Sequence, residues 1–405
     1  MNLVDITSLD HNGRGIGKVN NKVIFIENTL PKETVSFKII KDKKNYLEGN
    51  LIKIFKKSND RITPICPYYE ECGGCNLMHT NYDFQLNFKE EKIKNIFNKY
   101  LNSTIKINKI ICSDKNINYR NKVTFQVDKK IGFYKRKSND IVYINKCFLI
   151  DNKINDIIYD LNKLNLESIK SITCRCNEND IMVVINVKNK INESSVINTL
   201  KDKCTSIIIN YKNNFKCIYG NNYIINTIGD KYYFVTNDGF FQINKDITYK
   251  LYSKIKEYAD LTGNETVLDL YCGSGTIGIF LSDMCKKVIG VEINKYSIEC
   301  AKKNLKLNNI NNCEFICDST DNISLNVNPD IIILDPPRSG LSKKAITDII
   351  SFKAKKIIYV SCDPMTLVRD LNLLNEHYDI LEITPFDMFP NTHHVECISL
   401  LQRKD

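Results

Sequence analysis

The sequence lacks the long apolar runs and the leader that mark membrane and secreted proteins. No stretch approaches the roughly 20 consecutive apolar residues that span a bilayer, and the segment Met1-Asn2-Leu3-Val4 shows neither a basic start nor an apolar signal core. We therefore expect a cytoplasmic protein. Disulfides are rare in that reducing compartment, so clustered members of its 16 cysteines predict metal ligands or catalytic groups, and scattered ones predict packing.

Acidic residues are scarce in the first part of the chain. Residues 1–150 hold 27 Lys and Arg against 15 Asp and Glu, whereas the other 255 residues hold 30 against 32. A basic surface supplies the sequence-independent part of nucleic-acid affinity, so this asymmetry favours a phosphate-binding N-terminal half, with a solvated lysine-rich surface as the alternative.

A chain of 405 residues is long enough for two or three domains. Short β-like runs at 22–26, 34–40 and 47–54 follow a glycine-marked loop and predict a small N-terminal barrel over residues 1–58, of the kind that binds oligonucleotides. Residues 59–245 read as a β-rich central domain. From residue 246 strands and helices alternate to residue 405, so the whole is a multidomain α/β protein.

Three cysteines, Cys66, Cys72 and Cys75, form a C-x5-C-x2-C array around a Gly-Gly pair. So close a set of thiols in a cytosolic chain predicts a metal centre, and a fourth ligand is needed for either tetrahedral zinc or a four-iron cluster. Cys147 is the best candidate, with Cys112 and His79 allowed by the spacing. The spacing leaves zinc and iron–sulfur open.

The C-terminal segment begins with a nucleotide-binding βαβ pattern. The run Thr266-Val267-Leu268-Asp269-Leu270 leads into a loop from Gly273 to Gly278, and the next apolar run ends at Glu292. Glycines let the backbone approach a ligand, and a carboxylate at this spacing can accept hydrogen bonds from two ribose hydroxyls. This pattern alone allows NAD or S-adenosylmethionine. A buried run ending in Asp335-Pro336-Pro337-Arg338 then favours the class I methyltransferase fold, because hydride transfer has no use for that turn.

Cys362 is the candidate nucleophile. It follows the apolar run Ile357-Ile358-Tyr359-Val360 within Ser361-Cys362-Asp363-Pro364, and the carboxyl ends of strands are where open α/β sheets bind ligands. A further motif, Thr392-His393-His394-Val395-Glu396, ends in an acidic residue. For the two histidines a structural role is favoured.

These motifs, in this order, resemble those of the RNA (uracil-5-)-methyltransferases. The cysteine array and the glycine-marked barrel resemble the 23S rRNA members, whose barrel is called a TRAM domain. The resemblance implies a four-iron, four-sulfur cluster on Cys66, Cys72, Cys75 and Cys147. Around S-adenosylmethionine it implies the following residues: Gln242, Tyr271, Thr276, Glu292, Asp318 and Asp335.

The same resemblance implies the chemistry. Cys362 would add to C6 of uracil, which enriches C5 enough to attack the methyl group of S-adenosylmethionine, and Glu396 would then remove the C5 proton. Asp335 would orient the uracil edge. The expected substrate is single-stranded or flipped-out RNA, most simply 23S rRNA. The alternatives are tRNA as the substrate, or an iron–sulfur RNA-binding protein without activity.

The chain departs from the family at one position. The family usually has Asn where this chain has Asp363. A carboxylate beside the nucleophile could raise the pKa of its thiol.

Overall fold

In the computed structural model, residues 2–101, 104–237, 239–320 and 327–404 are described. The chain forms two compact units. The first comprises Met1–Lys92, Phe133–Val142 and Phe389–His393, and the second comprises Ile93–Gly132, Tyr143–Met388 and His394–Asp405. The domain boundaries expected at residues 58 and 245 stay a prediction. Within the described ranges, no helix is both long and apolar enough to cross a membrane.

The first unit is built on a six-stranded sheet of order β1-β5-β6-β4-β3-β2. Its strands are β1 (Asn2–Asp5), β2 (Ser8–Leu9), β3 (Gly15–Val19), β4 (Lys22–Ile26), β5 (Thr34–Asp42) and β6 (Tyr46–Lys56). Alternate side chains point inward to a small core that includes Ile24, Val35 and Phe37. A Cβ on Gly17 would lie 2.5 Å from Val4 Cγ2, so glycine lets β3 and β1 approach and curl the sheet. The expected N-terminal β module is present.

A 19-residue helix, α1 (Tyr82–Tyr100), follows the cysteine-rich segment. The sequence analysis did not predict this helix, because it expected a β-rich domain over residues 59–245. Asn81 accepts a hydrogen bond of 2.8 Å from the Phe84 N–H and so starts the helix, and the buried residues Ile93, Ile96 and Phe97 recur at helical spacing.

The first part of the second unit is β-rich, as expected. Strands β8, β11, β12, β13 and β14 lie in that order in one sheet, and β15 pairs with β16. Their bounds are β8 (Lys122–Val127), β11 (Ile169–Cys176), β12 (Ile181–Val187), β13 (Ser206–Tyr211), β14 (Asn214–Gly220), β15 (Tyr223–Ile228) and β16 (Lys231–Thr236). The smaller elements of this part are α2 (Asn152–Asn155), α3 (Ile158–Leu161), η1 (Leu166–Ser168) and α4 (Glu193–Leu200). Two short strands, β9 (Ile131–Tyr134) and β10 (Ile141–Tyr143), include residues of both units.

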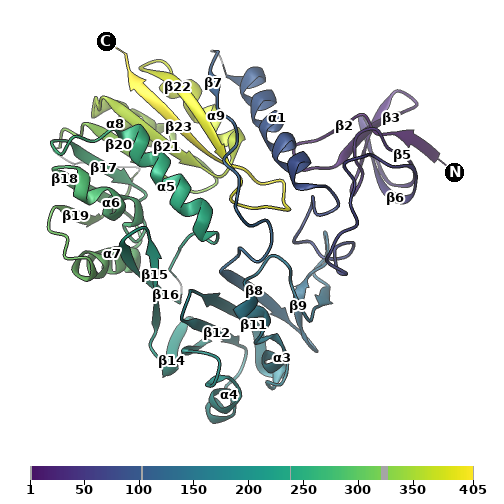
Figure 1. Ribbon diagram of the computed structural model, residues 1–405, viewed down its shortest axis with the longest axis horizontal. Coiled ribbons are helices and arrows are strands. Elements are labelled where there is room, and N and C mark those ends of the chain that lie inside the picture. Colours follow the sequence, from purple (N-terminus) through teal and green to yellow (C-terminus); the bar gives the residue numbers. More distant parts are fainter. Residues whose placement is uncertain (1, 102–103, 238, 321–326, 405) are drawn as a thin grey trace. The chain divides into compact units, whose positions relative to one another are not determined.

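The rest of the second unit is a doubly wound sheet of order β19-β18-β17-β20-β21-β23-β22-β7. Its strands are coloured from green to yellow in Figure 1, except β7, which is blue. Its strands are β7 (Lys106–Ile107), β17 (Thr266–Leu270), β18 (Lys287–Glu292), β19 (Cys313–Cys317), β20 (Ile331–Leu334), β21 (Lys356–Ser361), β22 (Tyr378–Phe386) and β23 (Glu396–Arg403). The helices are α5 (Lys245–Ala259), α6 (Thr276–Leu281), η2 (Ser282–Met284), α7 (Lys295–Leu307), α8 (Lys343–Ser351) and α9 (Pro364–Leu374).

The direction of the strands places the site. Strands β17 to β21 pair in parallel, and β23 runs antiparallel between β21 and β22. The chain order reverses between β17 and β20, which is the switch point where such sheets form a crevice at their carboxyl ends.

Candidate active site

Five of the predicted residues stand at the carboxyl ends of five neighbouring strands. They are Tyr271 after β17, Glu292 at the end of β18, Asp318 after β19, Asp335 after β20 and Cys362 after β21. The parallel register keeps these ends level, since Leu270 pairs with Val291 and with Leu334. The fold therefore gathers them along one edge of the sheet.

Glu292 is fixed against the glycine loop. Its Oε2 accepts a hydrogen bond of 3.2 Å from the Gly273 N–H, and its Oε1 accepts one of 2.8 Å from the Asn294 N–H. The backbone N–H of Asp318 donates to the Glu292 carbonyl at 3.2 Å, which joins the ends of β18 and β19. Tyr271 takes a positive φ of 61° at the start of the loop. This edge of the sheet therefore presents the fixed carboxylate of Glu292 next to the backbone of the glycine loop, an arrangement that suits the binding of a ribose.

Two other predicted residues lie outside these strand ends. Thr276 is the first residue of α6, and its hydroxyl lies 2.7 Å from the hydroxyl of the buried Tyr252. Gln242 is half-buried ahead of α5, and its carbonyl accepts a hydrogen bond of 3.1 Å from the Asn121 side chain. That bond fixes the backbone at Gln242 and leaves the role of its side chain a prediction.

Asp269, a buried carboxyl on β17, is a residue that the sequence analysis missed. Its Oδ2 accepts a hydrogen bond of 3.0 Å from the Gly278 N–H, and its Oδ1 has no partner in the described part of the chain. Burial, together with the charges of Asp335 and Glu292, raises the pKa of Asp269 to about 8, against the lowering effect of the hydrogen bond from Gly278. An acidic residue inside an otherwise apolar strand was the signal available in the sequence.

Cys362, Asp335 and Glu396 share one electrostatic environment. In the β21–β23 register Ser361 pairs with Cys397, so the next position along places Glu396 level with Cys362. Burial raises the pKa of the Cys362 thiol to about 11; the Glu396 carboxylate also raises it, and the Arg338 guanidinium lowers it. Burial likewise raises the pKa of Glu396 to about 8 and that of Asp335 to about 7. Two carboxyls that titrate near neutral pH beside a thiol suit proton transfer.

Asp363 is the N-cap residue of α9. Its carboxylate caps α9 by accepting hydrogen bonds from the backbone N–H groups of Met365 at 2.9 Å and Thr366 at 3.1 Å. Asn and Asp are equally good N-caps, so either residue can start this helix.

A buried carboxylate on α9 anchors the loop that carries Arg338. Asp370 accepts hydrogen bonds of 2.7 Å from the Tyr359 hydroxyl and 2.8 Å from the Leu341 N–H. The neighbouring Arg369 donates to the Ser339 carbonyl at 2.9 Å. The helix that begins beside Cys362 therefore also holds the turn after Asp335.

Three of the predicted metal ligands lie together on one turn-rich segment of the first unit. Cys66, Cys72 and Cys75 are half-buried, and burial raises the pKa of the Cys66 and Cys72 thiols. The Gly74 N–H donates to Cys72 Sγ at 3.5 Å, a contact that suits a thiolate. The donors thus fit a metal–thiolate centre in kind. Across the described ranges, however, no three Cys, His, Asp or Glu side chains form a metal-ready group.

The candidates for the fourth ligand have different surroundings. Cys147 lies in the second unit, where its backbone exchanges hydrogen bonds of 2.9 and 3.0 Å with the Asn155 side chain. Cys112 is exposed in that unit. His79 is buried in the first unit, with Nδ1 2.6 Å from the Tyr69 hydroxyl. The choice of Cys147 stays a prediction.

Comparison with known proteins identifies relatives over nearly the whole length. A family model described as tRNA (Uracil-5-)-methyltransferase matches residues 81–404, and a TRAM domain model matches residues 3–52. An uncharacterised RNA methyltransferase of Staphylococcus aureus is 36% identical over 440 aligned positions, covering 98% of this chain and 97% of that protein. One of Clostridium tetani is also 36% identical, with 98% and 95% covered.

A solved structure has the same fold. The tRNA (uracil-54, C5)-methyltransferase of Pyrococcus abyssi, in complex with S-adenosyl-L-homocysteine, superposes with a TM-score of 0.82 at 27% identity. The match covers 98% of this chain and 99% of that one. It confirms the expected fold class, a β-rich TRAM domain followed by a class I methyltransferase fold.

Proposed function

The chain belongs to the tRNA (uracil-5-)-methyltransferase family and is an RNA-modifying transferase that uses S-adenosylmethionine; from this premise we propose that it methylates C5 of a uridine in 23S rRNA. The observation that carries the chemistry is the placement of Glu396 level with Cys362, at the strand ends that also hold Asp335. The basic N-terminal half and the TRAM domain support an RNA substrate.

In this proposal, five of the predicted residues bind the methyl donor. Tyr271, Glu292 and Asp318 would hold it at the ends of β17, β18 and β19, and Gln242 and Thr276 would supply further contacts. The bound donor supplies an electrophilic methyl group on a sulfonium.

The protein's own groups carry the remaining steps. The Cys362 thiol gives its proton to solvent water, and the thiolate forms a bond to uracil C6 while the C5–C6 π electrons move toward C5 and the O4 carbonyl. C5 would take the methyl group of the bound donor, whose methyl–sulfur bond breaks so that its sulfur leaves as a neutral thioether, and Asp335 holds the uracil edge. The Glu396 carboxylate then removes the C5 proton, the C5–C6 double bond re-forms and the C6–sulfur bond breaks, which returns the thiolate. A pKa of about 8 makes Glu396 a competent base near neutral pH.

The deciding experiment traps the covalent adduct. A Glu396→Gln variant, given S-adenosylmethionine and transcribed 23S rRNA fragments, should accumulate a protein–RNA species that survives denaturation. Cys362→Ala should form none and should not turn over, whereas Cys217→Ala, at a half-buried cysteine on β14 in the other sheet of the second unit, should behave as wild type. Full turnover by Cys362→Ala, with no adduct in Glu396→Gln, would refute the mechanism.

A second substrate class has its own support. The structural relative from Pyrococcus abyssi is a tRNA methyltransferase, and the matching family model carries a tRNA name. Tritiated methyl transfer to purified tRNA and to 23S rRNA, side by side, separates the two. Transfer to tRNA alone would overturn the rRNA proposal and leave the uridine chemistry standing.

We also propose that Cys66, Cys72 and Cys75, with Cys147, hold a four-iron, four-sulfur cluster. The support is the donor chemistry of the array and its place in the sequence. Anaerobic purification should yield about four irons and four sulfides per chain by the stoichiometry of such a cluster. Stoichiometric zinc would overturn this assignment.

A further inference from the structure

The turn between β22 and β23 belongs partly to each of the two units. The chain leaves β22 after Phe386 and enters β23 at Glu396, and these two residues pair in the antiparallel ladder. Within the turn, Phe389–His393 belongs to the first unit, whereas both strands belong to the second. The chain therefore passes through the first unit just before it reaches the proposed base.

Asn391, in the middle of this turn, exchanges hydrogen bonds with a side chain of α1. The Asn391 N–H donates to Gln85 Oε1 at 2.8 Å, and Gln85 Nε2 donates to Asn391 Oδ1 at 3.2 Å. The Asn391 carbonyl accepts hydrogen bonds from the N–H groups of Asn76 at 3.0 Å and Leu77 at 3.1 Å. Because Gln85 and Asn391 are 2% and 5% exposed, water competes little for these bonds.

Two lysines of α1 hold the same turn. Lys89 Nζ donates to the Phe389 carbonyl at 3.1 Å, and Lys92 Nζ donates to the His393 carbonyl at 2.9 Å. Lys89 is fully buried, and burying an ammonium costs free energy unless hydrogen bonds compensate for it. Residues three and four positions apart share one face of a helix, so a single face of α1 contacts the turn. We refer to the residues that hold it as the turn clamp: Gln85, Lys89 and Lys92 of α1, with Asn76 and Leu77.

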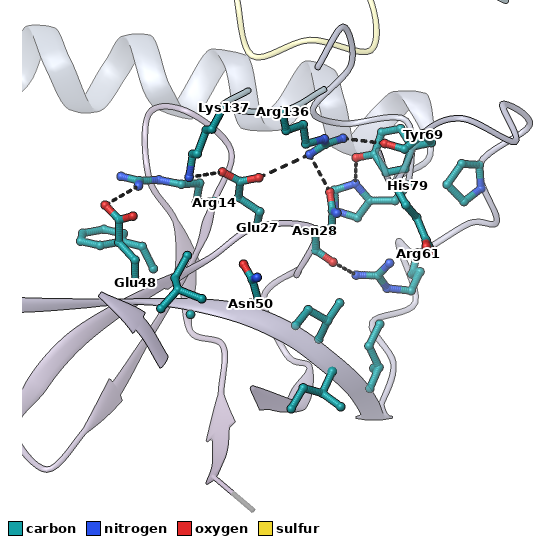
Figure 2. A pocket seen from close by; sticks show the side chains of 18 residues that line it. Arg14, Glu27, Asn28, Glu48, Asn50, Arg61, Tyr69, His79, Arg136 and Lys137 are labelled. Atoms are coloured by element: carbon teal, nitrogen blue, oxygen red, sulfur yellow. Dashed lines mark hydrogen bonds and ion pairs between the residues drawn. The ribbon is translucent and has the colours of Figure 1, made fainter. Parts of the chain in front are cut away.

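The segment that carries Asn76 is itself held in place. The Tyr69 hydroxyl donates to the Asn76 carbonyl at 2.8 Å and lies 2.6 Å from His79 Nδ1. The Arg136 guanidinium donates to the Tyr69 carbonyl at 3.0 Å and to the Cys75 carbonyl at 2.7 Å. Figure 2 shows the contacts of Tyr69 with His79 and Arg136. The clamp is therefore fixed on the side of the first unit as well as on the helix.

Glu396 stands at the end of its strand, where such support matters. It is the first residue of β23, and the pairing of β23 with β21 ends one residue further in, at Cys397. Its partner Phe386 is the last residue of β22. The ends of strands open more readily than their middles. A turn that is held directly before Glu396 opposes that opening.

We propose that Gln85 and Asn391 are positioning residues, which hold this turn so that Glu396 stays level with Cys362. The inference rests on the proposed function, in which Glu396 removes the C5 proton. In this role neither residue takes part in the chemistry. A loosened turn should leave the addition of Cys362 to the uracil intact and slow the release of the adduct.

Two variants loosen the clamp. Gln85→Leu removes both bonds to Asn391, together with two longer bonds to the carbonyls of Leu77 and Thr80. Asn391→Gly removes only the side-chain amide, because glycine adopts the φ of 66° at this position without strain. The control is Thr80→Val, which loses a buried hydrogen bond of 2.8 Å to the Leu77 carbonyl that does not involve the turn. Circular dichroism and thermal melting check folding, and Asn391→Gly decides if Gln85→Leu does not fold.

The first measurement needs no RNA. Alkylation of Cys362 by iodoacetamide reports on the Glu396 charge, because that charge raises the pKa of the thiol. The other charges that act on this thiol are those of Arg338 and Asp335, which the variants leave in place. At pH 9.5 Gln85→Leu should speed alkylation about twofold or more, the effect of lowering the thiol pKa by about 0.3 unit. At pH 6.5, where Glu396 is mostly uncharged, the rate should not change.

The same substitution in a Glu396→Gln background separates positioning from general loosening. There Gln85→Leu should have no effect at either pH, since the charge that it displaces is gone. Asn391→Gly should act in the same direction as Gln85→Leu but more weakly, and Thr80→Val should match wild type. A rate raised equally at both pH values, or equally in both backgrounds, would overturn the inference. So would unchanged alkylation in the two clamp variants.

The second measurement uses RNA and S-adenosylmethionine. Gln85→Leu should lower kcat at least about fivefold with little change in KM, because a displaced base loses part of its contribution of about 10²–10⁴-fold. It should also accumulate the adduct that survives denaturation, whereas Thr80→Val should not. If the inference alone fails, wild type methylates RNA and Gln85→Leu turns over as Thr80→Val does. If the proposed function alone fails, wild type transfers no methyl group, yet the alkylation effect that depends on Glu396 persists.

Discussion

In the free protein, the side chain of Cys362 should be a thiol with a high pKa, and the charge of Glu396 should contribute to that pKa. Its pKa of about 11 comes first from burial and next from the Glu396 charge. At pH 8 a thiol of that pKa is about 0.1% thiolate, whereas an ordinary cysteine is about a quarter thiolate. Alkylation of Cys362 by iodoacetamide should therefore be about two hundred times slower than that of an exposed thiol, since only the thiolate reacts.

A Glu396→Gln substitution should speed this alkylation in a pH-dependent way. The pKa of Glu396 is about 8, so its charge is largely absent at pH 6.5 and largely present at pH 9.5. Removing the carboxyl should leave the rate nearly unchanged at pH 6.5. At pH 9.5 it should raise the rate about three- to tenfold, the effect of lowering the thiol pKa by half a unit to one unit.

The rate is measured by quenching at timed intervals and quantifying the modified Cys362 peptide by mass spectrometry. Cys285 serves as an internal reference, because burial raises its pKa to about 11 and its neighbouring charges are Glu265 and Asp283, so Glu396→Gln should not alter it. A rate ratio that stays flat from pH 6.5 to 9.5 would refute the electrostatic link between Glu396 and Cys362. So would an alkylation rate typical of an ordinary thiol.

Three further predictions follow from neighbouring features. Asp363→Asn should keep the cap of α9 and leave the free energy of unfolding nearly unchanged, whereas Asp363→Ala should lower it by about 1 kcal/mol in urea titrations. Equal losses of unfolding free energy in the two variants would show that the charge of Asp363, and not its cap, stabilises the protein. Gly275→Ala should abolish calorimetric binding of S-adenosylhomocysteine, because its new methyl would lie 2.4 Å from the Phe315 ring at a φ of 76°. Gly273→Ala, at a φ of 55° in open space, should cost only the about 1–2 kcal/mol of a left-handed residue, and similar effects of the two would contradict the steric reason. In the native state the pKa of Asp269 is raised from 3.8 to about 8, so the protein loses stability as the pH rises through that interval. The melting temperature of Asp269→Asn should therefore exceed that of wild type by an amount that grows from pH 4 to pH 8 and then levels off. A difference in melting temperature that does not depend on pH would contradict this prediction.

Much of the second unit follows from local sequence pattern. The run Ile357-Ile358-Tyr359-Val360 is a strand, and the alternation of helices and strands expected from residue 246 opens with α5, which begins at Lys245. Such elements are predictable because apolar runs, caps and turn residues act over a few positions. The helix α1 was missed because its polar composition carries only a weak apolar stripe, whose buried residues are decided by packing.

The cysteine array shows that spacing predicts some metal ligands and not others. Spacing alone identifies Cys66, Cys72 and Cys75 as neighbours, because ten residues cannot carry them far apart. A fourth ligand is a matter of long-range packing, which spacing does not constrain. Cys147 therefore rests on resemblance to the family, and metal analysis is its test.

The sequence by itself determined which groups stand at the strand ends, including Cys362, Asp335 and Glu292, because strand, turn and helix signals lie close to each of them. Only the tertiary structure decided that Glu396, on a strand far along the chain, lies level with Cys362, since antiparallel register is a non-local choice. It also decided that Asp363 caps a helix and that Asp269 is buried beside the glycine loop. Burial and neighbouring charge, which set the pKa of each acid and thiol, exist only once the chain has folded.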